Sequence, residues 1–164
     1  MTPADLDPAD LRILGQLQLN GRITNAELAE RIGLSPAATH KRVRRLEEDG
    51  VIHHYAAVLD QKKCGRAQSV FVQVSLSSQK REDCDQFEAR IARSPLVIQC
   101  HLVSGDFDYL VHVLVRDTEE YESFHHGFLS TLPHVSRITS SFVLRTVRHA
   151  TSIPLPVVRV ETAA

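Results

Sequence analysis

Apolar side chains in the first fifty residues recur at intervals of three and four positions, the spacing of helices that bury one face. Three such stripes follow one another closely. They consist of Leu11, Ile13, Leu14 and Leu17, then of Leu28, Ala29 and Ile32, and then of Ala38, Thr39, Val43 and Leu46. The pattern predicts three short helices that pack together through these faces.

Capping residues mark where each predicted helix begins and ends. A proline in the first helical position follows Asp7 and also Ser35, and Thr24 has the spacing of a capping box with Glu27. The three ends fall at Asn20-Gly21, Gly33 and Gly50. These boundaries agree with the apolar stripes.

Only Gly33 and Leu34 separate the second helix from the cap of the third, a spacing typical of a helix-turn-helix. In that motif the second helix enters the DNA major groove with its N-terminal residues toward the base edges. Small residues there let the backbone approach the groove, and basic residues reach bases or phosphates. The predicted DNA-binding residues are Ser35, Pro36, Ala37, Ala38, His40, Lys41, Arg44 and Arg45. The β-rich stretch from Val51 to Leu59 would follow as a wing or linker strand.

A basic cluster supports this interpretation. Lys41, Arg42, Arg44 and Arg45 lie within five positions with no acid among them, although the chain of 164 residues has a net charge of −1. Such a cluster on a neutral background favours an anionic partner such as double-stranded DNA. The alternative is an exposed helix face whose arginines pair with carboxylates of the same molecule, such as the acids at 47–49.

From residue 69 onward the pattern alternates between strands and helices. Val70, Val72, Val74 and Leu76 share one face of a predicted strand. Helices are predicted over 81–94 and after Asp117, further strands over 97–104, 109–115 and 135–148, and a turn at 105–108. The order βαββαβ predicts a ferredoxin-like domain, in which both helices cover one face of a four-stranded antiparallel sheet. The uncovered face is expected to form a dimer contact or to bind a ligand.

The sequence therefore predicts an α+β protein with an N-terminal winged helix-turn-helix domain joined to a C-terminal ferredoxin-like domain. The expected boundaries are 1–60 for the DNA-binding domain, 61–68 for a linker, 69–150 for the ferredoxin-like domain and 151–164 for a tail. Pro154 and Pro156 make that tail extended rather than helical.

Composition excludes several classes of protein. A chain with 43% hydrophobic and 24% charged residues is typical of a soluble globular protein. We find no apolar stretch suited to a membrane span, and the acidic segment from Met1 to Asp5 does not resemble a secretory signal. Three cysteines form no even-numbered disulfide framework, so reduced thiols in a cytoplasm are expected.

Metal binding and catalysis are weaker hypotheses. The nine histidines include His101 and His112, which we expect to lie opposite one another across the 105–108 turn with Cys100 nearby. Two imidazoles and a thiol can ligate zinc or copper, but the same residues suit a polar sheet face at a subunit contact. Adjacent histidines such as His125 and His126 point about 100° apart on a helix and do not easily meet one ion. The sequence lacks the motifs of nucleophilic, phosphate-binding or zinc-dependent enzymes. We therefore expect that the protein is not an enzyme and that it binds no cofactor or metal.

The chain resembles the leucine-responsive regulator family, Lrp/AsnC, over nearly its full length. In the first half the matching stretches are Gly21-Arg22-Ile23-Thr24-Asn25, Gly33-Leu34-Ser35-Pro36, Arg42-Val43-Arg44-Arg45-Leu46-Glu47 and Gly50-Val51-Ile52. In the second half, residues 101–110 (HLVSGDFDYL) resemble the ligand-loop motif of the family, and Leu132-Pro133 precedes the last strand. The combination is specific because both halves match in the same order.

The resemblance implies a homodimer, often assembled into octamers or larger rings, that binds promoters through paired helix-turn-helix heads. It also implies a small effector, usually an amino acid, bound by the second domain at a subunit interface. The effector-binding residues carried over are Gly105, Asp106, Asp108, Thr139, Ser140 and Ser141. Either aspartate could receive an α-ammonium group and the turn N–H groups an α-carboxylate, whereas the alternative is a Gly-Asp turn in which the aspartate binds its own backbone.

Three hypotheses for function follow. The first is a sequence-specific transcription regulator whose oligomeric state or DNA-head placement responds to an amino acid. The second is an architectural DNA-binding protein that acts without an effector. The third is a metal-responsive regulator that uses the histidines.

Overall fold

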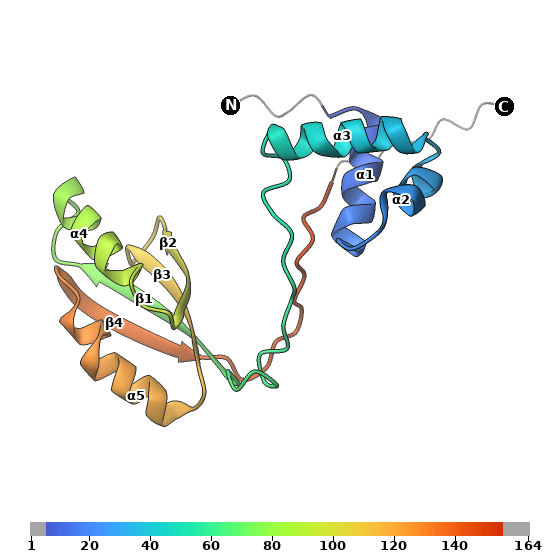
Figure 1. The fold of residues 1–164 in the computed structure, drawn as a ribbon. Coiled ribbons are helices and arrows are strands. Elements are labelled where there is room, and N and C mark those ends of the chain that lie inside the picture. Colours follow the sequence, from blue (N-terminus) through green and yellow to red (C-terminus); the bar gives the residue numbers. More distant parts are fainter. Residues whose placement is uncertain (1–5, 156–164) are drawn as a thin grey trace. The chain divides into compact units, whose positions relative to one another are not determined.

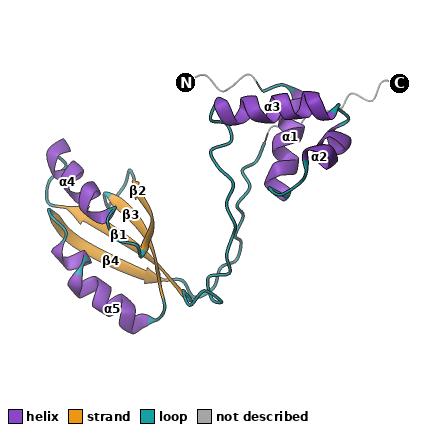
Figure 2. Ribbon diagram, in the orientation of Figure 1, coloured by secondary structure: helices purple, strands orange, loops and turns teal. Residues whose placement is uncertain are grey.

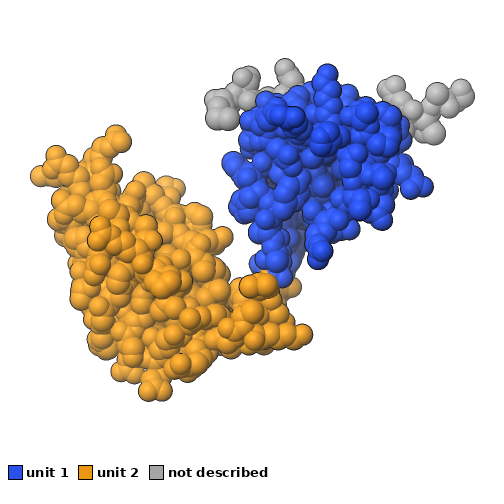
Figure 3. All heavy atoms as spheres, in the orientation of Figure 1, with its two compact units in different colours: residues 1–58, 148–164 blue, residues 59–147 orange. Residues whose placement is uncertain are grey.

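The computed structural model describes residues 6–155, which form two compact units (Figure 3). Residues 6–58 and 148–155 make up one unit, here called the head unit, and residues 59–147 make up the other, here called the sheet unit. Residues 1–5 of the predicted DNA-binding domain and 156–164 of the predicted tail lie outside the described residues. The return of residues 148–155 to the head unit was not anticipated from the sequence.

Three helices form the head unit: α1 (Pro8–Leu19), α2 (Asn25–Ile32) and α3 (Pro36–Glu48) (Figure 1). Their predicted caps are confirmed by the hydrogen bonds. The Asp7 carboxylate accepts from the backbone N–H of Ala9 at 2.8 Å, Thr24 and Glu27 form the reciprocal capping box, and the Ser35 hydroxyl accepts from the N–H of Ala38 at 3.2 Å. Gly33 ends α2 in the left-handed conformation, with φ of 71°, which a glycine adopts without steric cost.

The predicted apolar stripes meet in the core of the head unit. Its buried members are Ile13, Leu14, Leu28, Ile32 and Leu46, and Leu17, Ile23, Leu34 and Val43 pack around them partly buried. The stripe spacing of three and four residues therefore places one face of each helix inward, as expected.

Four strands and two helices form the sheet unit, with a short 3-10 turn, η1 (Leu129–Thr131), after the second helix (Figure 2). The strands and helices are β1 (Gln68–Leu76), α4 (Arg81–Ile91), β2 (Val97–Leu102), β3 (Tyr109–Val115), α5 (Thr118–Gly127) and β4 (Val135–Phe142). The strand order in the sheet is β2-β3-β1-β4, and every neighbouring pair is antiparallel. This arrangement confirms the predicted ferredoxin-like βαββαβ fold.

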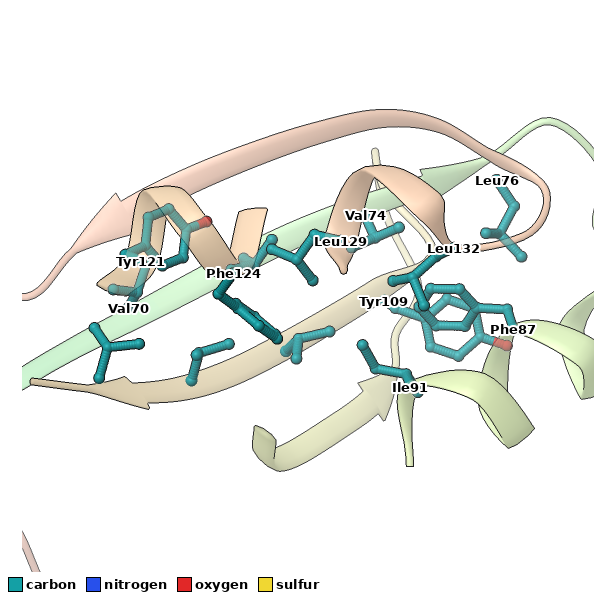
Figure 4. Close-up of a cluster of buried hydrophobic side chains, with 14 residues drawn as sticks. Val70, Val74, Leu76, Phe87, Ile91, Tyr109, Tyr121, Phe124, Leu129 and Leu132 are labelled. Atoms are coloured by element: carbon teal, nitrogen blue, oxygen red, sulfur yellow. The ribbon is translucent and has the colours of Figure 1, made fainter. Parts of the chain in front are cut away.

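One face of the sheet is covered by both helices (Figure 4). Val70, Val72 and Val74 of β1 alternate inward, and the odd-numbered residues of β3 do the same. Their partners from the helical layer include Phe87, Ile91, Tyr121, Phe124, Leu129 and Leu132. The opposite face, here called the uncovered face, includes Phe71, Gln73, Leu110, His112, Thr139 and Ser141.

Two predicted strands are wrong in extent. Residues 51–67 contain no strand, and β4 ends at Phe142 instead of continuing to residue 148. The β4 ladder stops because its neighbour β1 begins at Gln68. Beyond the first residues after Phe142, β1 therefore offers no further backbone groups for ladder hydrogen bonds. Alternation of β-favouring residues predicts an extended backbone, but only a neighbouring strand supplies ladder hydrogen bonds.

Within residues 6–155, the structure contains no helix that combines the length and the apolar character needed to cross a membrane.

Candidate nucleic-acid interface and effector turn

The start of the third helix, α3, is fixed by a hydrogen bond from α2 and by one to its own cap. The Asn25 side chain, at the first position of α2, donates to the Pro36 carbonyl at 2.8 Å. Thr39 is fully buried and donates its hydroxyl hydrogen to the Ser35 carbonyl at 3.0 Å. Leu46 buries the other end of the same face. The inner side of α3 is therefore held by the rest of the head unit, which determines the side that faces solvent.

The predicted DNA-binding residues lie on or beside the solvent side of α3. All of them are exposed except Ala38, which is half-buried. A groove along the helix is lined by Ala38, Lys41, Arg42, Arg44, Arg45 and Glu48. Arg44 donates to Glu48 at 2.7 Å, and both side chains are largely exposed. An exposed ion pair of this kind contributes little stability, so it does not fix the Arg44 side chain. Lys41 and Arg44 are thus available to an anionic partner.

Two arginines of the basic cluster bind carboxylates of α1 and its cap instead. Asp10 is fully buried and accepts from Arg42 at 2.9 Å and from Arg45 at 2.5 Å. Arg42 also donates to Asp7 at 2.6 Å. The N–H of Asp10 and the Arg42 guanidinium lower the pKa of Asp7, and the two carboxylates raise that of Arg42. The alternative of internal pairing therefore holds for these two arginines, mainly with acids at the start of the chain.

The sequence analysis did not predict this network around Asp10. A signal was present, because Asp10 precedes Ile13 and Leu14 by three and four residues and so lies on the buried stripe of α1. An acid on such a stripe needs a buried cation, since an unpaired carboxylate is costly to remove from water. Nothing in the sequence, however, identified Arg42 and Arg45 as its partners.

The turn between β2 and β3 has a different register from the one predicted. The N–H of Val103 donates to the Asp108 carbonyl at 2.9 Å and closes a loop of residues 104–107. His101 pairs with Leu110, whereas His112 pairs with Gln99. The prediction that His101 lies opposite His112 is therefore wrong, because the turn is centred one residue earlier, between Gly105 and Asp106. Gly105 has φ of 136°, a conformation that disfavours any side chain.

The two aspartates of this turn have different surroundings. Asp108 is half-buried, and its carboxylate accepts from the N–H of Leu76 and from the Gln79 side chain, both at 2.7 Å. It therefore fixes the end of β1 to the turn, rather than binding its own backbone. Asp106 is exposed, and its carbonyl oxygen lies 3.4 Å from a guanidinium nitrogen of Arg137 on β4.

The three predicted effector residues of β4 do not lie on one face. Thr139 pairs with Gln73 and Ser141 with Phe71, which places both on the uncovered face, where they are exposed. Ser140 points to the helical layer and hydrogen-bonds the Tyr121 hydroxyl. The structure thus brings Thr139 and Ser141 onto the uncovered face and separates Ser140 from them.

The centre of the uncovered face is partly apolar. Phe71 is 37% exposed and stacks on the His112 ring, with centroids 4.4 Å apart. The Ser69 hydroxyl hydrogen-bonds the same imidazole, and burial lowers the pKa of His112.

The structure does not assemble the residues of the metal hypothesis. Cys100 packs against the sheet-unit core, and burial together with Glu88 raises the pKa of its thiol to about 11. His101 points to the other side of β2, because its neighbour Cys100 faces the core. The rings of His125 and His126 are 5.4 Å apart and nearly perpendicular. In the described part of the chain, no three His, Cys, Asp or Glu residues are placed to hold a metal ion.

Both halves of the chain match known proteins. Residues 69–153 match the family model of the Lrp/AsnC ligand binding domain, and residues 6–53 match a winged helix-turn-helix DNA-binding model. The chain is 41% identical over 152 residues to the Bkd operon transcriptional regulator of Pseudomonas aeruginosa, covering 93% of this chain and 99% of that protein. It is 38% identical over 146 residues to the leucine-responsive regulatory protein of Escherichia coli K12, covering 89% of each.

A solved structure supports the same assignment. The transcriptional regulator of Neisseria meningitidis in complex with L-Met has a TM-score of 0.87 and 35% identity, over 91% of this chain and 96% of that one. The order of the two domains, their folds and these similarities lead to one conclusion. The chain belongs to the Lrp/AsnC family of DNA-binding transcription regulators, which are not enzymes.

Proposed function

We propose that this regulator binds specific double-stranded DNA sites as a homodimer, and that an amino acid bound near Gly105 changes its oligomeric state or the placement of its DNA-binding heads. The exposed cationic side of α3 is the main support for the DNA-binding half. Its inner side is fixed by Thr39 and Leu46, so Lys41 and Arg44 face solvent together. A fixed helix with exposed cations suits major-groove binding.

The residues proposed to contact DNA have different roles according to their position along α3. Ser35, Pro36, Ala37, Ala38 and His40 form the end that approaches base edges. Lys41 and Arg44 follow on the exposed side and suit guanine edges or phosphates. Arg45 retains N–H groups that Asp10 does not use, and we assign these to a phosphate. Two heads related by a twofold axis would bind half-sites with centres about 10 bp apart, or a multiple of that spacing.

Dimerisation through the uncovered face is the assembly we favour. Phe71 of the central strand β1 is exposed there and stacks on His112, and Leu110 and Leu114 of β3 are only half-buried. An apolar patch of this kind on a sheet is typical of a protein interface. We propose further assembly of these dimers into octamers or larger rings, which sedimentation at several protein concentrations would test.

The proposed effector site combines charges suited to both ends of an amino acid. The carboxylates of Asp106 and Asp108 would attract the α-ammonium group, and Arg137 with the N–H groups beside Gly105 would receive the α-carboxylate. Thr139 and Ser141 add hydroxyls on the same face, whereas Ser140 is left out because it binds Tyr121. The related regulators that are named for leucine, and the one solved with L-Met, favour an apolar amino acid as the effector.

Thermal unfolding with each standard amino acid at millimolar concentration tests the effector half. A ligand present at about 100 times its Kd stabilises the folded protein by about 2.7 kcal/mol, which raises Tm by several degrees. We expect one or a few apolar amino acids to do so selectively. If all amino acids left Tm unchanged, the proposal of an amino-acid effector would be wrong, and an effector-independent architectural role would be favoured.

Asp108→Asn separates binding from folding in this test. Asparagine keeps an acceptor for the N–H of Leu76, so β1 stays fixed while the negative charge is lost. We expect the ligand-induced rise in Tm to disappear without a loss of DNA binding. Asp85→Asn, at an exposed position of α4, is the matched control and should retain the full response. A normal response in Asp108→Asn would remove Asp108 from the site.

A further inference from the structure

The chain returns to the head unit after the last strand and binds the end of α1. The side-chain amide of Gln18 donates to the Ile153 carbonyl at 3.3 Å, and the Ile153 N–H donates to the Gln18 side-chain oxygen at 2.7 Å. Leu155 packs partly buried against the head-unit core. Residues 148–155 are therefore held to the DNA-binding unit by a polar pair and an apolar contact.

The chemistry of this contact is specific for a glutamine facing a backbone. A side-chain amide carries the same donor and acceptor as a peptide group, so Gln18 pairs with Ile153 as a neighbouring strand would. The Ile153 side chain is 68% exposed and does not hold the segment, which leaves the backbone bonds and Leu155 to do so. Pro154, between them, has no N–H and restricts the backbone to an extended form.

We propose that residues 148–155 act as a latch that restrains the DNA-binding head, so that the head is joined to the sheet unit by two connectors instead of one. The first connector is residues 53–67, because Val51 and Ile52 still pack on the head-unit core, and the second is residues 143–152. The second leads directly from β4, which holds Thr139 and Ser141. The latch thus links the strand of the proposed effector site to α1 of the head. This role in DNA binding rests on the function proposed above.

Connector length explains why the second link matters. A chain of about 15 residues such as 53–67 can span about 50 Å when extended, which leaves one head free to sample many positions. The second connector, of about 10 residues, spans at most about 35 Å and closes a ring with the first. A restrained head loses less conformational entropy than a free one when two heads bind the same DNA. It also accommodates fewer spacings between the two half-sites.

Hydrogen exchange tests whether the latch exists in solution. We expect the amide of Ile153 to be protected in the parent protein, and Gln18→Ala to speed its exchange by about tenfold or more. Gln16→Ala is the matched control, since Gln16 lies on the same helix but accepts from Arg31 of α2. It should leave the Ile153 amide protected. A parent amide that exchanges freely, or one that stays protected in Gln18→Ala, would show that Gln18 does not form the latch.

DNA binding then tests the function of the latch. The probe is a duplex selected on the parent protein from a random pool, compared with the same duplex carrying about 5 bp between its half-sites and with a single half-site. For the parent we expect a large loss of affinity on insertion. In Gln18→Ala and in Leu155→Ser this loss should shrink by about fivefold, with single half-site affinity unchanged.

The outcomes separate the latch from the proposed function. An insertion penalty that is the same in the parent and both variants would overturn the restraining role, whatever the exchange data show. If the parent selected no duplex at all, the proposed DNA-binding function and the role of the latch in it would both be wrong. The exchange result would still decide by itself whether residues 148–155 are held by Gln18.

Discussion

The head unit and the sheet unit place their candidate sites in opposite ways. All the predicted DNA-binding residues of the head lie in one continuous stretch, 35–45, and one helix positions them. The proposed effector residues of the sheet unit come from the 105–108 turn and from β4, which lie far apart in the sequence. The ladder through β1 places Thr139 level with Leu110 and Ser141 level with His112, and Arg137 of β4 reaches the turn at Asp106. A contiguous site can therefore be recognised from local spacing, whereas an assembled site depends on register and face.

The two units also differ in what stabilises them. The sheet-unit core has 14 buried side chains, all apolar or aromatic, whereas the head-unit core has 5. The head unit instead contains Asp10, a fully buried carboxylate between Arg42 and Arg45. Among the described residues it is the only charged side chain that is buried to this degree. We therefore expect the head to depend on an ionic network and the sheet unit on apolar packing.

Asp10→Ala should give the largest effect. It removes the carboxylate that holds two guanidinium groups and breaks the capping box with Asp7, so we expect the head unit to lose about 3 kcal/mol of stability. Calorimetry should show the head transition at a lower temperature and the sheet-unit transition unchanged.

Asp49→Ala is the control for Asp10. Asp49 is exposed and lies 4.0 Å from Arg45, so its loss should cost less than about 0.5 kcal/mol. If Asp10→Ala cost no more than Asp49→Ala, the network would not be what stabilises the head.

Two glycine substitutions should have opposite signs in the two units. Gly105→Ala forces a side chain into φ of 136° and should destabilise the sheet unit by about 2 kcal/mol. Gly15→Ala lies inside α1 with open space around the new Cβ and should stabilise the head by about 0.5–1 kcal/mol. Urea unfolding of both variants measures each change. A neutral Gly105→Ala would mean that the turn adopts another conformation in solution.

The salt dependence of DNA binding tests the exposed side of α3. Lys41→Ala and Arg44→Ala should each lower affinity by about tenfold and reduce the slope of log affinity against log salt by about 0.9, the effect of one lost phosphate contact. Lys63→Ala, in the turn at the start of the sheet unit, is the control and should change neither value. Binding that is insensitive to salt in the parent would contradict the electrostatic argument.

Local rules predicted the head well because its structure is local. The caps at Asp7, Thr24 and Ser35 and the left-handed Gly33 act within a few residues, and the structure contains all of them. What the sequence did not reveal is longer in range. The partners of Asp10 lie 32 and 35 residues away, and Gln18 binds a segment 135 residues distant. Spacing along a helix contains no information about such partners.

In the sheet unit, alternation predicted the elements and the inward faces but not the register. The period of two correctly placed Val70, Val72 and Val74 in the core. The turn between β2 and β3 was predicted one residue too late. The predicted partner of His112 was therefore His101, whereas the observed partner is Gln99. Alternation along β4 also places Ser140 on the opposite face from Thr139 and Ser141. The resemblance to the family, which assigned all three residues to the effector site, does not show this difference.

The smallest expected effect is a difference between the two units in how their stability depends on pH. Burial lowers the pKa of His112 below its ordinary value of 6.5, so the unfolded chain takes up a proton there first as the pH falls. The sheet unit should therefore lose stability from pH 6.5 downward until the folded pKa is passed. The pKa of Asp7 is lowered from 3.8, so it destabilises the head only below that pH.

The variant His112→Gln assigns the effect. It removes the titrating ring while keeping a donor for Ser69, so the drop in Tm of the sheet unit between pH 7 and 5 should become smaller. His101→Gln, on the same face at an exposed position of β2, should leave the drop unchanged. If both variants kept the full pH dependence of the parent, other groups would determine acid stability, and the contrast between an ionic head and a sheet unit sensitive to one half-buried histidine would fail.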